Sequence, residues 1–141
     1  ELAGEINHYM PQWVVGKVMD ALNDRGKALK GSHILVLGLA YKKNIDDTRE
    51  SPAVEIMDLL QDKGAEVAYS DPHVPKFPRK RNYHFDLQSV ALTPESIASY
   101  DCLVLATDHD GFDYQQLVQH ARLVVDTRGR LGVGRANVVA A

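Results

Sequence analysis

The chain has 141 residues, of which 45% are hydrophobic and 25% charged, and its net charge is -3. This length and composition are those of one ordinary globular domain that can bury a core of its own. The acidic balance argues against a nucleic-acid-binding or anionic-membrane surface, and no apolar stretch approaches the roughly 20 residues that a membrane-spanning helix needs.

A long amphipathic helix is the first element that the sequence predicts, over residues 6–22. Apolar residues recur four apart, and others widen the stripe: Ile6, Met10, Val14, Val18 and Leu22, with Trp13, Val15, Met19 and Ala21. Pro11 predicts a kink or a restart. So much apolar surface needs a partner, which is the domain itself, a missing domain or a second copy. Because the chain opens without Met on what reads as mid-helix sequence, we expect it to be part of a longer protein.

Strands and helices then alternate. The apolar runs HILVLG, AEVAYSD, DCLVLATD and RLVVDTRG predict four buried strands, and FDLQSVALT (85–93) leaves an edge strand open. Helices are expected over 52–63, 94–100 and 114–121. Ser51 and Thr93 suit N-caps, and Pro52 and Pro94 suit first helical positions. The sequence therefore predicts a three-layer α/β/α, Rossmann-like open sheet that is mostly parallel and preceded by a long amphipathic helix.

Charged side chains follow the predicted strands. In such folds ligands bind past the carboxyl ends of the strands, which places these residues on one rim: Lys42, Arg49, Arg128 and Arg130 with Asp46, Asp47, Asp71, Asp108 and Asp126. Cations there suit phosphate or pyrophosphate, as does the N-terminus of the 52–63 helix. The alternative, that these charges only solvate loops and that Asp47 and Arg49 clamp one loop, stays open.

Other candidate groups receive structural interpretations. Asp71 before Pro72 predicts a turn, and His109 is expected at the surface. Cys102, the one cysteine, is expected to be an inert buried thiol, which suits a reducing cytoplasm. No histidine pair has metal-ligand spacing, and neither GxGxxG nor GxSxG is present. The residues by themselves predict a phosphate-binding rim without a nucleophile, a general base or a metal site.

Four segments resemble a known family. VLGLAYKKNIDDTRESPA, GAEVAYSDPHVP, DCLVLATDH and VVDTRG are similar to the C-terminal domain of the UDP-glucose/GDP-mannose dehydrogenase family, and ELAGEINHYMPQWVV resembles the central helix before it. The amino-acid sequence of these segments is most similar to the UDP-N-acetylglucosamine (or N-acetylmannosamine-type) 6-dehydrogenase branch. The resemblance implies that residues 1–30 are the end of a central dimerisation helix with a linker, and that residues 31–141 are a nucleotide-sugar-binding α/β domain.

The resemblance also implies site roles. Tyr41, Lys42 and Arg128 contact the nucleotide sugar, Arg49 reaches the NAD bound on another domain, and Asp47 orients Arg49. Family members oxidise the C6 alcohol of a nucleotide sugar to a carboxylate, with two NAD+ per turnover and a cysteine thioester. That cysteine, the catalytic lysine and the glycine-rich loop lie upstream in the family and are missing here. We therefore expect this polypeptide alone to be inactive, without catalytic residues.

The implied partners are a UDP-sugar, the protein's own N-terminal domain and a second copy joined through the first helix, in the cytoplasm, with no nucleic acid or membrane. Two alternatives remain. A receiver-like signalling module has a similar sheet with acidic strand ends, but the last strand here ends in DTRG, without the lysine that a phosphoryl site would use. A stand-alone nucleotide-binding module without catalysis is the other.

Overall fold

The computed structural model describes residues 2–40, 51–77, 87–132 and 134–141, with only the backbone considered for residues 2–10. The helices are α1 (Leu2–Asn23), α2 (Pro52–Asp62), α3 (Pro94–Ser99) and α4 (Tyr114–His120). The strands are β1 (His33–Leu37), β2 (Glu66–Ser70), β3 (Cys102–Leu105), β4 (Val124–Asp126) and β5 (Val138–Ala140). The four strong strands and the four helices predicted from the sequence are thereby confirmed.

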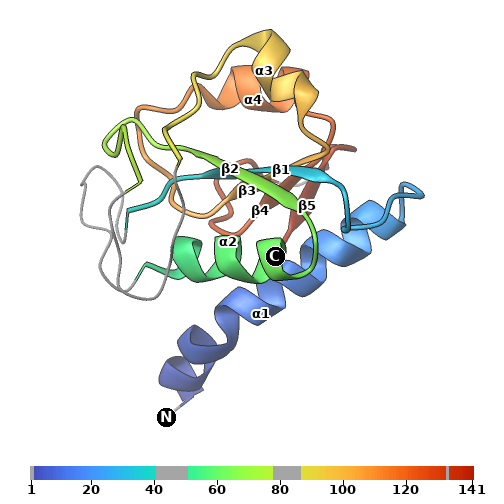
Figure 1. Ribbon diagram of the computed structural model, residues 1–141, viewed down its shortest axis with the longest axis vertical. Helices are drawn as coiled ribbons and strands as arrows, with labels where there is room; N and C mark the ends of the chain where they lie inside the picture. The colour runs from blue at the N-terminus through green and yellow to red at the C-terminus, as the bar shows by residue number, and fades with distance from the viewer. Residues whose placement is uncertain (1, 41–50, 78–86, 133) are drawn as a thin grey trace.

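All five strands run parallel, in the order β2-β1-β3-β4-β5. Helices α1 and α2 cover one face of the sheet, and α3 and α4 cover the other (Figure 1). Alternate strand residues serve the two cores, so that Ile34 and Val36 of β1 pack toward α1 and α2, and Leu35 and Leu37 toward α3 and α4. The predicted three-layer architecture is confirmed.

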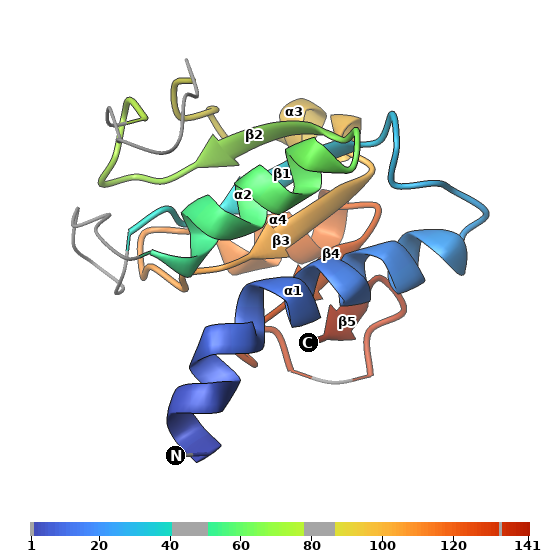
Figure 2. The ribbon, with the colours of Figure 1, turned by 60° about the horizontal axis from the view of Figure 1, so that its bottom comes forward.

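The local signals of the helices act as expected. The Ser51 hydroxyl accepts a hydrogen bond from the backbone N–H of Ala53 at 3.2 Å, and Thr93 forms a capping box with Ser96. Helix α1 contains Pro11 in its interior, and its axis changes direction along its length in Figure 2, as the loss of a backbone donor in a helix predicts. The kink, one of the two outcomes expected for Pro11, is what forms.

The structure decides two points that the sequence left open. Trp13 and Met19 do not join the buried stripe of α1, since they are 59% and 41% exposed. Residues 87–93 contain no edge strand, because among them only Gln88 makes a β-bridge, antiparallel to Lys76. The strand that the sequence did not predict is β5, which pairs with β4 at the edge of the sheet opposite β2.

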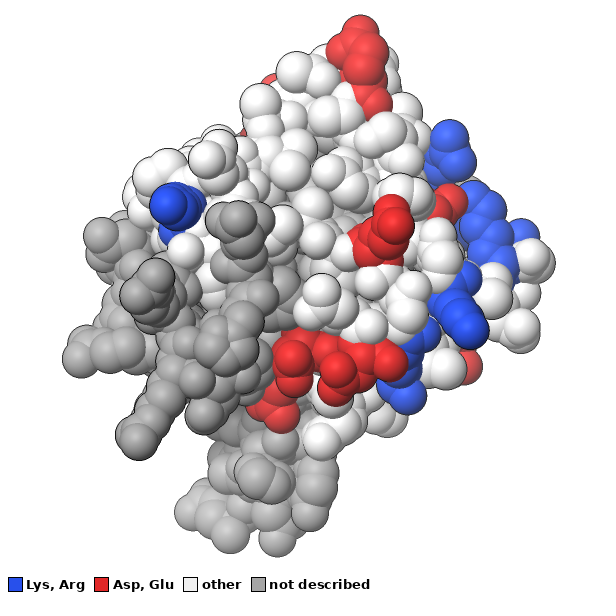
Figure 3. All heavy atoms as spheres, viewed as in Figure 1, with Lys and Arg blue, Asp and Glu red and all other residues white. Residues whose placement is uncertain are grey.

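The surface in Figure 3 carries charges of both signs. Basic side chains gather toward the end of α1 that leads into β1, and acidic side chains lie on the same face. No helix in the described part of the chain combines the length and hydropathy that a bilayer crossing requires.

The sheet has a topological switch point between β1 and β3. The chain leaves β1 toward β2 on one side and later resumes on the other side with β3, so that the connections from these adjacent strands run to opposite faces. A crevice at the carboxyl ends of such a strand pair is where ligands of doubly wound sheets bind. The site is therefore sought at the segments that follow β1 and β3.

Candidate functional site

The segments after β1 and β3 touch through their backbones. Gly38 has a φ of +88°, and a Cβ placed on it would stand 2.5 Å from the carbonyl oxygen of Thr107 and 2.6 Å from its Cβ. The Thr107 hydroxyl in turn donates to the carbonyl oxygen of Ala40 at 2.7 Å. Only glycine fits at position 38, so the sequence GLA after β1 fixes how closely the two segments approach.

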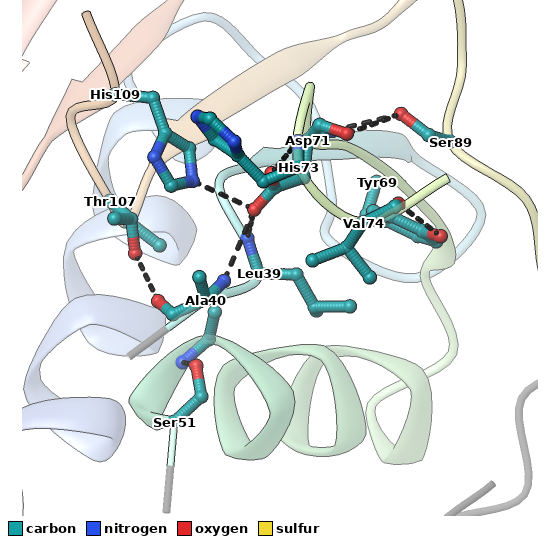
Figure 4. A network of polar contacts seen from close by, with 12 residues as sticks. Leu39, Ala40, Ser51, Tyr69, Asp71, His73, Val74, Ser89, Thr107 and His109 are labelled. Carbon is teal, nitrogen blue, oxygen red and sulfur yellow. Dashed lines mark hydrogen bonds and ion pairs between the residues drawn. The ribbon is translucent and has the colours of Figure 1, made fainter. Parts of the chain in front are cut away.

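Asp71, the residue after β2, is the centre of the polar network in Figure 4. Its Oδ2 accepts hydrogen bonds from the backbone N–H groups of Leu39 at 2.6 Å and Ala40 at 3.1 Å, and lies 2.8 Å from Nε2 of His109. Its Oδ1 accepts from the backbone N–H of His73 at 2.7 Å. Asp71 does form the expected turn, but it also ties the segment after β2 to those after β1 and β3.

The Asp71–His109 contact is fully buried, with both side chains 0% exposed. Desolvation raises the pKa of Asp71, but hydrogen bonds from His109, Leu39 and His73 and the charge interaction with His109 outweigh it, so the pKa lies below its usual value. The carboxylate is thus ionised near neutral pH, and Nε2 of His109 donates to it. The expectation that His109 is a surface residue is wrong.

Further contacts extend this network on both sides. The His73 ring, on an exposed residue, lies 4.7 Å from the His109 ring, and the Tyr114 hydroxyl donates to the His109 carbonyl oxygen at 2.5 Å. The Ser89 hydroxyl accepts from the backbone N–H of Asp71 at 2.9 Å. Different segments therefore hold the His109 ring, the His109 carbonyl oxygen and the Asp71 backbone in place.

Arg128 follows β4 at the same edge of the sheet. Its Nε donates to the carbonyl oxygen of Ala106 at 2.9 Å, and its backbone N–H donates to the Asp126 carboxylate at 2.9 Å. Asp126 is buried and also accepts from the backbone N–H of Leu131. Within the described residues, the two terminal nitrogens of Arg128 have no hydrogen-bonding partner, and the residue is exposed. An exposed guanidinium that is anchored through Nε and keeps its terminal nitrogens available suits a phosphate.

Arg130 has a different role from the rim cation that the sequence predicts. Its NH1 lies 3.6 Å from an Asp108 carboxylate oxygen and 3.4 Å from one of Asp110, and its guanidinium stacks 4.5 Å from the centre of the Tyr114 ring. Two carboxylates offset its charge, so it offers little to an anion. Asp71 and Asp126 are likewise structural acceptors rather than exposed rim charges.

Several predicted site residues lie outside the described residues: Tyr41, Lys42, Asp46, Asp47 and Arg49. Their roles stay predictions. The structure does place the residues on either side of them, Ala40 beside Asp71 and Thr107, and Ser51 at the N-terminus of α2. Arg128 is the one sequence-predicted substrate residue that the structure describes.

No redox or metal centre is found in the described residues. Cys102 is 0% exposed, and desolvation raises its pKa to about 12, which confirms the expectation of an inert core thiol. Among these residues no group of three or more His, Cys, Asp and Glu side chains could hold a metal ion.

The fold is a doubly wound α/β domain, and the described part of its switch-point edge carries one exposed, anchored arginine, Arg128, that suits a phosphate. The chain belongs to the UDP-glucose/GDP-mannose dehydrogenase family, whose UDP-binding domain matches residues 35–132, from β1 through the segment after β4. The resemblance stated from the sequence is confirmed at the level of the family.

Individual relatives agree. A UDP-N-acetyl-D-mannosamine dehydrogenase of Escherichia coli is 36% identical over 136 residues, covering 90% of this chain and 31% of that protein. The structure of a UDP-D-ManNAc dehydrogenase from Pyrococcus horikoshii matches the fold with a TM-score of 0.76 at 24% identity, over 99% of this chain and 32% of that one.

A UDP-glucose dehydrogenase from Pyrobaculum islandicum has a TM-score of 0.62 at 31% identity, over 86% of this chain and 27% of that one. This chain therefore spans about a quarter to a third of the length of the relatives it matches. Family membership decides against the receiver-like alternative, which the strand order alone does not, because receiver domains share this order.

Proposed function

We propose that this chain is the nucleotide-sugar-binding part of an NAD-dependent UDP-sugar 6-dehydrogenase, and that it holds the UDP moiety at the switch point. The observation that carries the proposal is Arg128, an exposed residue whose Nε is anchored 2.9 Å from the Ala106 carbonyl oxygen at the end of β3, while its two terminal nitrogens have no hydrogen-bonding partner among the described residues. The match of the family's UDP-binding domain to residues 35–132, which include Arg128, supports the same assignment. Tyr41 and Lys42 would complete the contacts to the nucleotide sugar.

The substrate class we propose is a UDP-N-acetylhexosamine. Similar proteins are named UDP-N-acetyl-D-mannosamine dehydrogenase in both Escherichia coli and Methanococcus maripaludis. The N-acetylglucosamine branch and UDP-glucose are the competing choices, the latter because a UDP-glucose dehydrogenase is 31% identical in structure-based comparison. Since a nucleotide site recognises what these substrates share, we assign the choice of sugar mainly to residues outside this chain.

The oxidation itself we assign to a longer protein. The proposed chemistry, from the C6 alcohol to the carboxylate with two NAD per turnover, needs a reactive cysteine, and Cys102 is a buried thiol of high pKa. The sequence has no GxGxxG turn, so NAD would bind mainly on an N-terminal domain, with Arg49 and Asp47 reaching toward it. The isolated chain would bind without catalysing.

The proposed assembly is a homodimer joined through α1, in the cytoplasm. The exposed Trp13 and Met19 supply apolar surface on this helix that the domain itself does not cover. No membrane or nucleic-acid partner is proposed.

An amide NMR titration of the 141-residue chain tests the function. We expect UDP to shift the signals of Arg128, Ala106 and the 41–50 loop, UDP-N-acetylhexosamines to shift the same set, and NAD to act mainly near Arg49. No shift with UDP at millimolar concentration contradicts the proposal. In parallel, NADH production from UDP-N-acetylhexosamines should equal the blank, and any turnover above it contradicts the assignment of catalysis to other residues.

A further inference from the structure

We infer that the buried Asp71–His109 pair is a positioning element of the nucleotide-sugar site, which fixes the backbone of Leu39 and Ala40. This inference rests on the proposed function. Neither residue touches the ligand in it. They act through the backbone of Leu39 and Ala40, the two residues directly before Tyr41.

One carboxylate oxygen of Asp71 is shared by several hydrogen-bond donors. Oδ2 of Asp71 lies within 3.1 Å of three donors: the N–H groups of Leu39 and Ala40, and Nε2 of His109. Two successive amides that point at one carboxylate oxygen fix the peptide planes on either side of Leu39. The backbone of Leu39 and Ala40 is thereby fixed by a side chain 31 residues after Ala40.

Asp71 is itself held in place by two other residues. His109 approaches from the segment after β3, and His73 bonds Oδ1 from the segment after β2. Both partners of the pair are excluded from water, so this charge-assisted bond is not weakened by solvent. The Thr107 hydroxyl donates to the carbonyl oxygen of Ala40 at 2.7 Å. Both the N–H and the carbonyl oxygen of Ala40 are therefore held by hydrogen bonds.

The Asp71–His109 pair is also linked to Arg128, the residue proposed to bind the nucleotide. The same segment after β3 that carries Thr107 and His109 also supplies, through the carbonyl oxygen of Ala106, the anchor of Arg128. The pair therefore links Leu39 and Ala40, which precede Tyr41 and Lys42 in the sequence, to the segment that anchors Arg128. A site assembled before the ligand arrives loses less conformational entropy on binding, so this link raises affinity for the nucleotide.

The experiment compares variants of the 141-residue chain by isothermal or NMR titration with UDP. Asp71→Asn removes the charged acceptor but keeps the shape. His109→Phe keeps a ring against Phe112 and His73 but removes the donor, whereas His109→Gln keeps a donor at about the position of Nε2. The control is Asp101→Asn. Asp101 accepts from the His33 N–H at 2.8 Å, at the amino end of the same strand β1 and far from the proposed site.

We expect Asp71→Asn to weaken UDP binding about tenfold, the loss that one charge-assisted hydrogen bond predicts. His109→Phe should weaken it severalfold, and His109→Gln should restore most of that loss. Asp101→Asn should lower stability yet leave the dissociation constant within about twofold. If Asp71→Asn does not fold, the difference between His109→Phe and His109→Gln decides.

Two negative results can be told apart. If the unaltered chain binds UDP and Asp71→Asn or His109→Phe binds it as well as Asp101→Asn does, the positioning role is wrong while the nucleotide site stands. If the unaltered chain does not bind UDP at all, the proposed function is wrong and this inference falls with it.

Discussion

Gly38 and Thr107 are in backbone contact, so close that a Cβ on Gly38 would stand 2.5 Å from the Thr107 carbonyl oxygen. This approach brings the segments after β1 and β3 together at the switch point, and the Asp71 network is built around it. Since the atom in the way belongs to the backbone, no side-chain rotation relieves the clash.

Gly38→Ala should therefore be severely destabilising. A left-handed φ of +88° costs an L-residue about 1–2 kcal/mol, and overlap with a packed backbone adds a similar amount, for a total of about 3 kcal/mol. Urea denaturation measures this change. Gly26→Ala is the matched control, because Gly26 has a φ of +72° with nothing within 4 Å of the added Cβ, and it should lose only about 1 kcal/mol. Equal losses at the two positions would contradict the close approach.

Arg128→Met should weaken UDP binding by about tenfold or more while changing the free energy of unfolding by less than about 1 kcal/mol. Arg128→Lys should recover part of the affinity, because an ammonium supplies charge without the two-pronged guanidinium. Arg122→Met is the control, since Arg122 is an exposed arginine just before β4, the strand that Arg128 follows. Its NH1 lies 3.8 Å from a carboxylate oxygen of Asp101. Titration with UDP that finds the two Met variants alike would remove Arg128 from the site.

The elements that the sequence predicted correctly are those with strong local signals. β1 and β3 are continuous apolar runs, and Ser51 and Thr93 cap their helices from one residue before them. His109 was misjudged because its neighbours are two aspartates, which suggest solvent. Its burial comes from Asp71, 38 residues away, and no local pattern encodes that pairing.

The other differences have similar causes. Strand β5 is only three residues long and no more than half-buried, too short to show a period. Trp13 and Met19 belong to an apolar stripe wider than the surface that the domain covers. As for the site, Arg128 could be placed because it directly follows an apolar strand, whereas the roles of Tyr41, Lys42, Asp47 and Arg49 rest on resemblance alone.

Asp101 should make the stability of the domain depend on pH. A hydrogen bond from Lys27, at 2.8 Å, and one from the His33 N–H lower the pKa of this carboxyl. Because the folded pKa lies below the unfolded value near 3.9, the stabilisation is fully present above that pH and is lost as pH falls through the folded pKa. Asp101→Asn should thus cost about 1 kcal/mol at pH 7, and the cost should shrink as pH falls below the unfolded pKa of about 3.9. Urea denaturation at pH 7, 5 and 3 measures the difference. A cost that does not change with pH would mean that ionisation of Asp101 contributes nothing.

Cys102 should resist alkylation in the folded chain. Burial raises its pKa to about 12, so little thiolate is present at pH 8. The side chain is also inaccessible, so the reagent cannot reach the sulfur in the folded chain. Mass spectrometry after iodoacetamide treatment should find little label without denaturant and complete label in 8 M urea. Rapid labelling of the folded chain would show a reactive thiol and reopen the question of a nucleophile in this domain.

Trp13 offers a direct reading of the proposed dimer, because it is the single tryptophan of the chain and is 59% exposed on α1. If a second copy covers this face, tryptophan emission should move to shorter wavelength as protein concentration rises, in step with the increase in mass measured by sedimentation equilibrium. Trp13→Glu should abolish the increase in mass, because it places a charge where an aromatic ring would be buried. Asn23→Glu, at the exposed end of the same helix, adds the same charge and should leave association unchanged. A chain that stays monomeric at high concentration, with an emission that does not depend on concentration, would leave α1 to pack against another part of a longer protein instead.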